Sequence, residues 1–341
     1  MIKLRAALIY TPGKPFVVEE VEVPKIRSNE VLVRVRACGI CHGDAHTTHE
    51  GMDLPKKPMI MGHEIAGDIA EVGEAVSGFK QGERVLVWHY QACGICEHCR
   101  SGNENLCDNL SILGMTTDGG YAEYVKATAN SLVRLPDELP YDACILPCAG
   151  LTAFHAVRDV ARVAVGENVV IMGVGGVGLS ILQWAKLSGA RVIGVDVIEE
   201  KLKEAVKLGA DDVINATKQE VQKEIMKLTN GKGAEVIFEL VGLPQTMENS
   251  LNSLAKRGKY VFIGYHAQHN FNVHPLKILG RELKILGSRS GTKKELEKVV
   301  DLTRAGKFKL LVTKTVTLEE LNQTLDQVYH GEIFGRAIVK P

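Results

Sequence analysis

The segment Val169-Val-Ile-Met-Gly-Val-Gly-Gly-Val-Gly178 indicates the architecture of the second half of this chain. Its apolar start predicts a buried strand that enters a turn at Gly173, and the segment after Gly178 has the pattern of a helix. A second apolar run, residues 192–195, then ends in Asp196. The order strand, glycine-rich turn, helix, strand and acid is typical of an α/β unit that binds a dinucleotide.

Each part of this motif has its own physical role. Gly173 allows the tight turn, Gly175 lets the backbone come close to a pyrophosphate, and Gly178 lets the helix pack closely on the strand. The helix N-terminus offers N–H groups and the positive end of its dipole to the phosphates. Asp196 can accept hydrogen bonds from ribose hydroxyls and would repel a 2′-phosphate, so the motif predicts NAD rather than NADP.

The amino-acid composition and charge limit the classes of protein to which this chain can belong. The chain has 341 residues, 45% hydrophobic and 24% charged, with a formal net charge of zero. These values indicate a globular protein with two domains of ordinary size. The neutral charge and the lack of a long Lys/Arg block argue against nucleic-acid and membrane partners. We find no apolar run of about 18 residues and no signal-peptide cleavage pattern, so we expect no transmembrane helix and a cytoplasmic protein.

The two halves of the chain have different hydrophobic patterns. Residues 17–23, 30–36, 65–72 and 84–88 have the pattern of strands, which predicts a β-rich first domain. From Gly166 strands alternate with helices, so we expect a doubly wound parallel sheet of six strands. The predicted strands are residues 169–172, 191–196, 212–215, 235–240, 259–264 and 283–287. Helices are expected between them, for example at residues 199–208, 219–228 and 245–254.

Eight cysteines lie at short spacings, which suits metal binding in a reducing compartment better than disulfides. Four of them, Cys93, Cys96, Cys99 and Cys107, are separated by two, two and seven residues in a polar stretch. Four thiolates with no open position form a structural zinc site. The alternative is an iron–sulfur cluster, but the bacterial pattern has a shorter last gap followed by proline, whereas Asp108 follows here.

Further candidate ligands are spread over the first half of the chain. A catalytic zinc keeps three nitrogen or sulfur ligands and leaves one position open. Cys41, His63 and Cys148 would supply such a set. Spacing alone does not choose them, because other side chains compete and any single cysteine can be buried and inert. The competing residues are Cys38, His42, His46, His49 and Cys144.

Together these motifs resemble the zinc-dependent alcohol dehydrogenases of the medium-chain dehydrogenase/reductase superfamily, over essentially the whole length. The resemblance rests on the glycine motif with Asp196, the four-cysteine stretch, and the segments 41–44, 62–64, 148–152 and 335–336. It implies an α/β protein with a GroES-like β-rich catalytic domain and a Rossmann NAD-binding domain. We expect the catalytic domain at 1–151 and 292–341, its structural zinc lobe at about 90–110, and the Rossmann domain at 152–291.

The resemblance also implies roles for residues around the catalytic zinc. The zinc ligands of the family match Cys41, His63 and Cys148, and Glu64 matches an acid beside the metal that can coordinate it transiently. Asp44 matches an acid behind the metal. Such an acid orients a ligand histidine through its other ring nitrogen, and His63 is the expected partner.

For the cofactor, His42 and Arg336 match positions that contact the pyrophosphate, Thr152 a position near the nicotinamide, and Lys201 a lysine that contacts the adenosine ribose. The alternative for Lys201 and Arg336 is a solvated surface charge. Four more residues are expected to contact the cofactor, namely Gly176, Val177, Val241 and Ile263. The expected cofactors are NAD(H) and two Zn²⁺ per chain, one catalytic and one structural.

The implied activity is reversible hydride transfer between a primary or secondary alcohol and NAD, with an aldehyde or ketone as product. One position departs from the family pattern. Gly43 stands where a Ser or Thr hydroxyl usually starts a proton relay toward a histidine that matches His46. A water molecule, Thr47 or Thr48 replaces that hydroxyl, or the relay is absent.

Gly43 leaves two alternative functions open. Some family members without the hydroxyl reduce activated C=C bonds, so the first alternative is a reductase of α,β-unsaturated carbonyl compounds or enoyl thioesters. The second is a non-catalytic regulator that binds zinc and nucleotide, although a complete set of ligands for an open metal site argues against it. Family members of this length are often homotetramers, so we expect a homo-oligomer.

Overall fold

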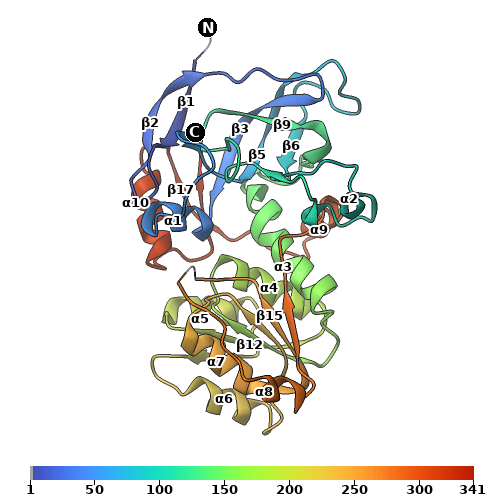
Figure 1. Ribbon diagram of the computed structural model, residues 1–341, viewed down its shortest axis with the longest axis vertical. Helices are drawn as coiled ribbons and strands as arrows, with labels where there is room; N and C mark the ends of the chain where they lie inside the picture. The colour runs from blue at the N-terminus through green and yellow to red at the C-terminus, as the bar shows by residue number, and fades with distance from the viewer. Residues whose placement is uncertain (1–2, 267) are drawn as a thin grey trace. The chain divides into compact units, whose positions relative to one another are not determined.

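The computed structural model describes residues 3–266 and 268–341. The chain divides into two compact units, the first formed by Met1–Cys148 with Thr292–Pro341 and the second by Ala149–Gly291. The first unit therefore combines the N-terminal half, blue to green in Figure 1, with the red C-terminal tail.

The first unit is built on a mixed sheet that has seven strands within the described residues, in the order β10-β6-β5-β3-β18-β17, with β9 also paired to β3. The bounds are β3 (Glu30–Ile40), β5 (Glu64–Val72), β6 (Arg84–Val87), β9 (Tyr124–Thr128), β10 (Leu132–Arg134), β17 (Val312–Val316) and β18 (Arg336–Val339). β18 pairs antiparallel with the end of β3, and Ala337 lies opposite Ile40. The C-terminal tail thus completes the sheet beside the residue at which β3 ends.

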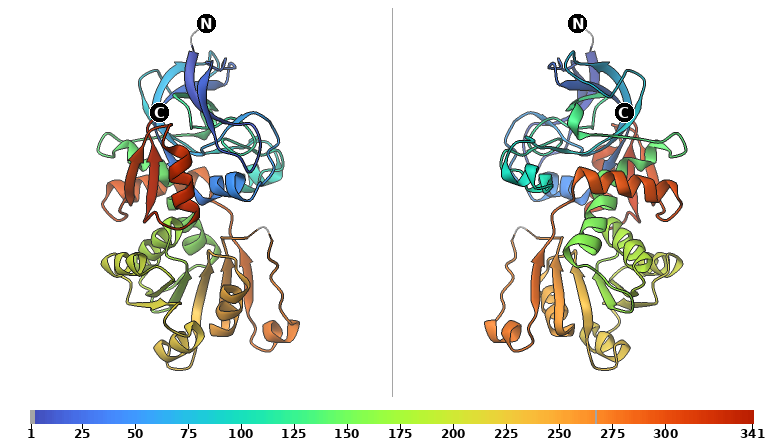
Figure 2. Two further views of the ribbon diagram at one scale, coloured as in Figure 1. Left: turned by 90° about the vertical axis from the view of Figure 1, so that its left-hand side faces the viewer. Right: turned by 90° about the vertical axis from the view of Figure 1, so that its right-hand side faces the viewer.

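Smaller elements surround this sheet. The other strands are β1 (Lys3–Ile9), β2 (Val17–Glu22) and β4 (Met59–Ile60), which form one sheet, and β7 (Tyr90–Gln91) and β8 (Ser111–Ile112), which form another. The α-helices are α1 (His42–His49), α2 (Glu97–Arg100), α9 (Lys293–Arg304) and α10 (Leu321–Tyr329). Short 3₁₀ helices lie at Glu104–Leu106 and Ala129–Ser131. α10 packs against α1, as Figures 1 and 2 both show.

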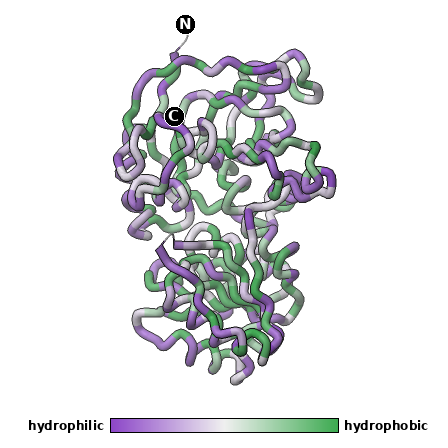
Figure 3. Tube along the Cα trace, in the orientation of Figure 1, coloured by the Kyte–Doolittle hydropathy of each residue, from purple (hydrophilic) through white to green (hydrophobic). Residues whose placement is uncertain are grey.

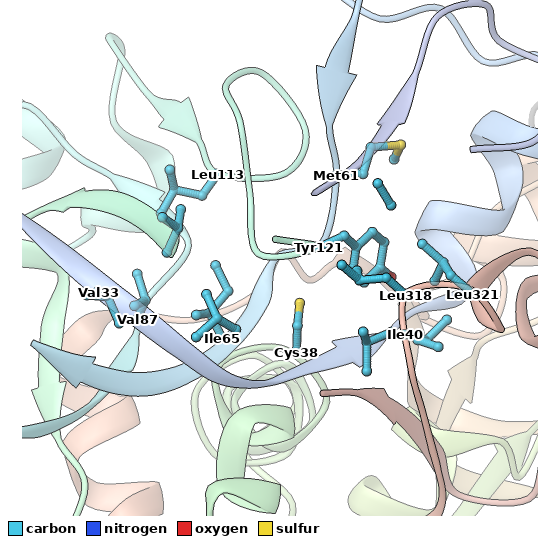
Figure 4. Packing of buried hydrophobic residues seen from close by; sticks show 14 of the residues in the cluster. Val33, Cys38, Ile40, Met61, Ile65, Val87, Leu113, Tyr121, Leu318 and Leu321 are labelled. Carbon is cyan, nitrogen blue, oxygen red and sulfur yellow. The ribbon is translucent and has the colours of Figure 1, made fainter. Parts of the chain in front are cut away.

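The core of the first unit surrounds Tyr121, which is 0% exposed. Cys38, from the central strand, lies in the same cluster as Tyr121 (Figure 4). Leu318 and Leu321 of the C-terminal tail also pack into it. The tail therefore contributes both a strand and core side chains, and apolar burial of this kind is the main force that holds such segments in place.

The second unit contains a parallel sheet with the order β13-β12-β11-β14-β15-β16. The strands are β11 (Asn168–Met172), β12 (Arg191–Asp196), β13 (Asp212–Asn215), β14 (Ala234–Glu239), β15 (Leu254–Phe262) and β16 (Lys284–Gly287). The helices are α4 (Gly176–Leu187), α5 (Glu199–Lys207), α6 (Val221–Leu228), α7 (Pro244–Ser253) and α8 (Pro275–Leu279). The predicted doubly wound sheet is confirmed, and each predicted strand is present within a few residues of its expected bounds.

Helices cover both faces of the parallel sheet (Figure 2). Strands buried on both faces are expected to be nearly continuously apolar, and Figure 3 shows them so. The order of strands reverses direction between β11 and β14. The carboxyl ends of strands at such a switch point are the usual place for a ligand in an open α/β sheet.

One helical stretch, Tyr141–Val160, is long and apolar enough by length and composition to cross a membrane, with a mean hydropathy of 1.2. It consists of a 3₁₀ segment (Tyr141–Ile145), a π segment (Leu146–Gly150), α3 (Leu151–His155) and a second π segment (Ala156–Val160). Arg158 and Asp159 interrupt the apolar run, which is why the sequence did not suggest a span here. Because 67% of its apolar window is buried inside the protein, the stretch has the character of a core helix.

Candidate metal centres and cofactor-binding turn

Cys41 lies between the end of β3 and the start of α1. The two strands that pair with the end of β3, β5 and β18, also place residues here. Gly39 of β3 pairs with Glu64 of β5, and Ile40 pairs with Ala337 of β18. Strand register therefore brings the side chains of Glu64 and Arg336 to the start of α1. The first turn of α1 is closed by Asp44, whose Oδ2 accepts a hydrogen bond from the Cys41 backbone N–H at 3.0 Å.

The structure gathers one group of candidate ligands at this junction. The ligand atoms of Cys41, His63, Glu64 and Cys148 all lie within 4.8 Å of one another. Cys148 joins them from the π segment at Leu146–Gly150. The competing candidates are not members of this group, namely Cys38, His42, His46, His49 and Cys144. Geometry thus separates a donor set that spacing alone left open.

Asp44 and Tyr121 lie behind His63. The Asp44 carboxylate is 0% exposed, and its Oδ1 lies 3.4 Å from Nδ1 of His63. Its Oδ2 accepts a hydrogen bond of 2.7 Å from the Tyr121 hydroxyl. Burial lowers the pKa of His63, but Asp44 and Cys41 outweigh that effect, so the pKa of His63 is raised well above its usual value. With Nδ1 turned to Asp44, Nε2 is the nitrogen available to a metal.

Glu64 and Arg336 form a buried ion pair beside Cys41. The Glu64 carboxylate is 0% exposed, and its Oε1 lies 3.1 Å from a guanidinium nitrogen of Arg336. Another contact joins Arg336 to Sγ of Cys41 at 3.7 Å. Burial raises the pKa of Glu64 to about 7, although Arg336 opposes this. Arg336 is therefore not the solvated surface charge that was considered as an alternative.

The two thiols of the group ionise differently. A hydrogen bond from Cys148 and the positive charge of Arg336 lower the pKa of Cys41 well below its usual value. The same bond to Cys41, together with burial, raises the pKa of Cys148. One thiol thus shares its proton with the other, an arrangement that a bound cation would replace by two thiolates.

The donor set fits a zinc ion. Oε1 of Glu64 pairs with Arg336, whereas its Oε2 is buried and lacks a hydrogen-bond partner. Buried acceptors of this kind cost free energy unless a cation or a donor compensates them. Two sulfurs and an imidazole are ligands that zinc prefers, and three protein ligands leave a fourth position open.

The four-cysteine stretch forms a second, separate group within the first unit. The sulfurs of Cys93, Cys96, Cys99 and Cys107 lie within 4.8 Å of one another. Cys93 Sγ and Cys99 Sγ are 3.9 Å apart, which excludes a disulfide between them in this structure. Hydrogen bonds from the backbone of Ile95 and Cys96 lower the pKa of Cys93 to about 6, whereas burial and the neighbouring Cys96 thiol raise the pKa of Cys99 to about 12. Four sulfurs at this spacing fit a closed zinc site.

Gly43 lies next to the Cys41 thiol. A Cβ at position 43 would lie 3.8 Å from Sγ of Cys41 and 3.7 Å from Cε of Met115, which are ordinary van der Waals distances. A small side chain therefore fits here. The Thr48 hydroxyl does not replace the missing group, because it bonds to the Ala45 carbonyl at 3.2 Å and to Nδ1 of His49 at 2.8 Å.

His46 is nearly buried on α1, one turn after Gly43. Its Nδ1 lies 3.0 Å from Oε2 of Glu50, a pair spaced four residues apart on the helix. Its ring packs edge-on against that of His42, with centroids 4.9 Å apart. The ring of His42 in turn stacks parallel to Tyr329 of α10 at 6.0 Å. Both histidines are thus held in defined positions by neighbouring side chains.

In the second unit, the three fingerprint glycines have distinct environments. Gly173 has φ of +96°, a conformation that L side chains rarely adopt. A Cβ at Gly178 would lie 2.1 Å from the Gly173 carbonyl oxygen, so helix α4 packs directly on the turn. A Cβ at Gly175 would have no atom within 4 Å. The turn therefore has open space at the position where a pyrophosphate would approach the helix N-terminus, and Gly176, Val177 and Gly178 form the first turn of that helix.

Asp196 ends β12 beside this turn. Its Oδ2 accepts a hydrogen bond of 3.0 Å from the Val174 N–H, and its Oδ1 accepts bonds from the N–H groups of Val197 and Ile198. Each carboxylate oxygen has two lone pairs, so Oδ1 is filled by its two bonds and Oδ2 can accept one more, from a ribose hydroxyl. The acid predicted to bind the ribose thus also holds the glycine-rich turn.

The remaining predicted cofactor residues lie on separate elements of the second unit. Lys201 lies in α5 and Thr152 in α3. Val241 lies two residues after the end of β14 and Ile263 directly after the end of β15, close to the switch point of the sheet. These positions suit contacts with a ligand at the carboxyl edge of the strands.

The sequence did not single out several residues that the structure places at these sites. Tyr121 and Glu239 are two of them, and their hydrogen-bond partners lie on other elements. Nothing in a single sequence links Tyr121 to Asp44. Glu50 could have been found, because a carboxylate four residues after a histidine on a helix lies on the same face.

Comparison with known proteins agrees with this architecture. Residues 27–137 match the alcohol dehydrogenase GroES-like domain, and residues 176–305 match the zinc-binding dehydrogenase family. The NAD-dependent alcohol dehydrogenase of Sulfurisphaera tokodaii is 38% identical over 99% of this chain and 100% of its own length. The acryloyl-coenzyme A reductase of the same organism is 35% identical over 99% of this chain and 100% of its own.

A solved structure gives the same result. The alcohol dehydrogenase of Aeropyrum pernix superposes with a TM-score of 0.93 at 34% identity, covering 99% of this chain and 100% of that one. Both domains are matched, and the similarity to these relatives covers 99% of this chain. The chain belongs to the zinc-containing alcohol dehydrogenase family of the medium-chain dehydrogenase/reductase superfamily.

Proposed function

We propose that this protein is an NAD- and zinc-dependent alcohol dehydrogenase that interconverts a primary or secondary alcohol with its aldehyde or ketone. The observation that carries the proposal is the group of Cys41, His63, Glu64 and Cys148, whose ligand atoms lie within 4.8 Å of one another and in which His63 and Glu64 are buried. The two cysteines and the histidine leave one of four positions open, which is typical of a catalytic rather than a structural zinc. The NAD-dependent relatives support the same activity.

The chain's own residues would hold the metal and the cofactor. Cys41, His63 and Cys148 would bind the catalytic zinc, with Glu64 able to enter its coordination, and Cys93, Cys96, Cys99 and Cys107 would bind the structural zinc. Bound zinc supplies a Lewis acid for the substrate oxygen, and NAD supplies the hydride acceptor. Asp44 orients His63, and Arg336 balances the charge of Glu64 and Cys41.

The second unit would bind NAD through the glycine-rich turn. The N–H groups at the start of α4 would receive the pyrophosphate, for which Gly175 leaves room. Asp196 would accept hydrogen bonds from the adenosine ribose and disfavour a 2′-phosphate. Lys201, Thr152, Val241 and Ile263 are proposed as further contacts, and His42 and Arg336 as phosphate contacts from the first unit.

The alcohol proton has to leave without a hydroxyl at position 43. His46 is the proposed acceptor, because it matches the relay histidine of the family and pairs through Nδ1 with Glu50, whose carboxylate would stabilise the protonated ring. A water molecule would have to connect the substrate oxygen to that nitrogen. In cells we propose a cytoplasmic homotetramer, for which resemblance to family members of this length is the support.

A reductase of activated C=C bonds is the second candidate, and Gly43 is the observation that favours it. The full-length similarity to acryloyl-coenzyme A reductase gives this candidate support. A double-bond reductase does not need to remove an alcohol proton from the metal site. The missing hydroxyl at position 43 would therefore not lower its rate. The two candidates therefore differ in the product formed rather than in the cofactor.

Product analysis separates the two candidates. Zinc-loaded protein is given NADH with simple aldehydes and ketones, and separately with enals and enoyl thioesters. We expect alcohols from the first panel. Saturated carbonyl products from the second panel, with little reduction in the first, would replace the alcohol dehydrogenase proposal by its alternative. An absence of NADH oxidation in both panels would count against both.

Metal content tests the two donor sets. We expect two zinc ions per chain by elemental analysis of the purified protein. Cys148→Ser should reduce this to one and remove activity, because the open site loses a thiolate ligand. The matched control is Cys144→Ser, a buried cysteine four residues away that lies outside both groups and should leave two. Loss of zinc from the Cys144 variant alone would show that the site is wrongly assigned.

Two glycine variants test the cofactor-binding turn. Gly175→Ala should leave the melting temperature unchanged, since its Cβ meets no atom within 4 Å, but should weaken NADH binding at least about tenfold by blocking the approach of the pyrophosphate. Gly178→Ala should destabilise the protein by about 1–3 kcal/mol, because its Cβ would lie 2.1 Å from the Gly173 oxygen. Fluorescence titration and thermal melting measure the two effects. Unchanged NADH affinity in the Gly175 variant would contradict the assigned turn.

A series at position 43 tests the missing hydroxyl. We expect Gly43→Ser to raise alcohol turnover at least about tenfold over Gly43→Ala, because general acid–base help is worth about 10²–10⁴-fold. Both side chains fit the same space beside Cys41 and Met115, so they differ only in the hydroxyl. Steady-state rates with several alcohols provide the measurement. Equal rates in the Ser and Ala variants would mean that this protein does not need the relay.

A further inference from the structure

Glu239 is a fully buried carboxylate that the proposed chemistry does not use. It ends β14 in the second unit and is 0% exposed. Both of its oxygens are hydrogen-bonded, and the donors come from the β14–α7 turn, from α7 and from β15. A carboxylate with so many donors is well compensated for burial. It therefore holds several elements together at one end of the sheet.

The two oxygens of Glu239 serve different parts of the fold. Oε1 accepts hydrogen bonds from the backbone N–H groups of Val241 at 3.0 Å and Gly242 at 2.9 Å, and from the Thr246 hydroxyl at 3.0 Å. Oε2 accepts from the hydroxyls of Ser250 and Tyr260, each at 3.1 Å. Oε1 thus shapes the turn after β14, whereas Oε2 binds groups that are 0% exposed in the interior.

The turn that Glu239 shapes lies at the switch point of the sheet. β14 is the neighbour of β11, and Glu239 pairs with Met172, the residue before Gly173. A Cβ at Gly173 would lie 3.0 Å from Cγ2 of Val241, so this turn packs directly on the glycine-rich turn. Any displacement of Val241 would therefore change the packing at Gly173, where the glycine-rich turn begins.

The backbone of Glu239 also holds the residues that follow the neighbouring strand, β15. Its carbonyl oxygen accepts hydrogen bonds of 3.0 Å from the N–H groups of both Ile263 and Gly264, just after β15. Val241 and Ile263 are the two residues proposed to contact NAD from this part of the sheet. One residue thus sets the position of both, through its side chain for Val241 and its backbone for Ile263.

Gly242 leaves this turn little freedom to rearrange. It has φ of +78°, and a Cβ there would lie 2.8 Å from the His266 backbone nitrogen. The N–H groups of Val241 and Gly242 are held by the Glu239 side chain alone among the contacts of the described residues. Removing the carboxylate would leave two adjacent N–H groups without their acceptor, which favours a different turn that can reach water.

We infer that Glu239 is a positioning residue for NAD, whose Oε1 holds the Val241–Gly242 turn against the glycine-rich turn in the shape that the cofactor requires. The inference rests on the proposed function, since it takes NAD as the ligand of this edge. Pre-organisation of this kind acts on affinity: if the turn adopts the binding shape only about a tenth of the time, the apparent Kd rises about tenfold.

Four variants separate positioning from stability, with the Kd for NADH measured by fluorescence titration and the melting temperature measured without cofactor. Glu239→Met, of similar size but with no acceptor, should raise the Kd about tenfold. Glu239→Gln keeps an acceptor oxygen for the turn, and its amide can donate to the two hydroxyls, so its Kd should stay close to that of the wild type. Tyr260→Phe removes a donor from Oε2 only, and it should lower the melting temperature without changing the Kd.

Thr246→Val removes a hydroxyl that lies 3.0 Å from Oε1 and 2.9 Å from the Leu243 carbonyl oxygen, so it changes the turn side of Glu239 and leaves Oε2 untouched. This variant decides between the outcomes if Glu239→Met does not fold, and its Kd should exceed that of Tyr260→Phe. Equal Kd values in the Thr246 and Tyr260 variants, or a wild-type Kd in a folded Glu239→Met variant, would overturn the inference. Wild-type protein that does not bind NADH would instead overturn the proposed function, so the two failures are distinguishable.

Discussion

Compensation of buried negative charge around Cys41 is the constraint on which the first unit depends. Asp44 and Glu64 are both 0% exposed and lie beside two cysteine thiols, while Arg336 supplies a cation from the last strand. An uncompensated buried ion costs several kcal/mol, so these groups are tolerable only in a fixed arrangement with partners or with a metal. The C-terminal tail, which apolar burial and strand pairing hold in the first unit, also supplies this cation: β18 lies beside β3 and brings Arg336 to Glu64.

The second unit uses buried or partly buried carboxylates for a different purpose. Asp196 ends β12 and Glu239 ends β14, the strands on either side of β11. Each accepts hydrogen bonds from backbone N–H groups of the turns at that edge of the sheet. Turns at the carboxyl ends of parallel strands have N–H groups that form no hydrogen bond within the sheet. A nearby carboxylate that accepts their hydrogen bonds fixes the conformation of the turn. Both units therefore place acids close to their sites. In the first unit the acids pair with His63 and Arg336, and in the second unit they fix the backbone of the turns.

Much of the fold could be predicted because its signals are local. The six parallel strands are short apolar runs bounded by glycine and polar residues, and the structure has them within a few residues of their predicted positions. The cysteines at positions 93–107 are close enough in sequence to meet whatever the rest of the chain does. The choice of Cys148 over Cys144 was not predictable by spacing, since both lie on one helical stretch and only packing decides which thiol faces Cys41.

Three features could be recognised from the amino-acid sequence, because each depends on residues that are neighbours along the chain: the strand–glycine–helix unit that ends in Asp196, the four-cysteine stretch and the resemblance to a zinc-dependent dehydrogenase. Three others became visible in the folded protein, namely the Glu64–Arg336 pair, the hydrogen bond from the Tyr121 hydroxyl to Asp44 and the donors that surround Glu239. These contacts join distant segments, and their geometry follows from strand register and helix packing. A single sequence contains no record of which strands become neighbours or which helix faces turn inward.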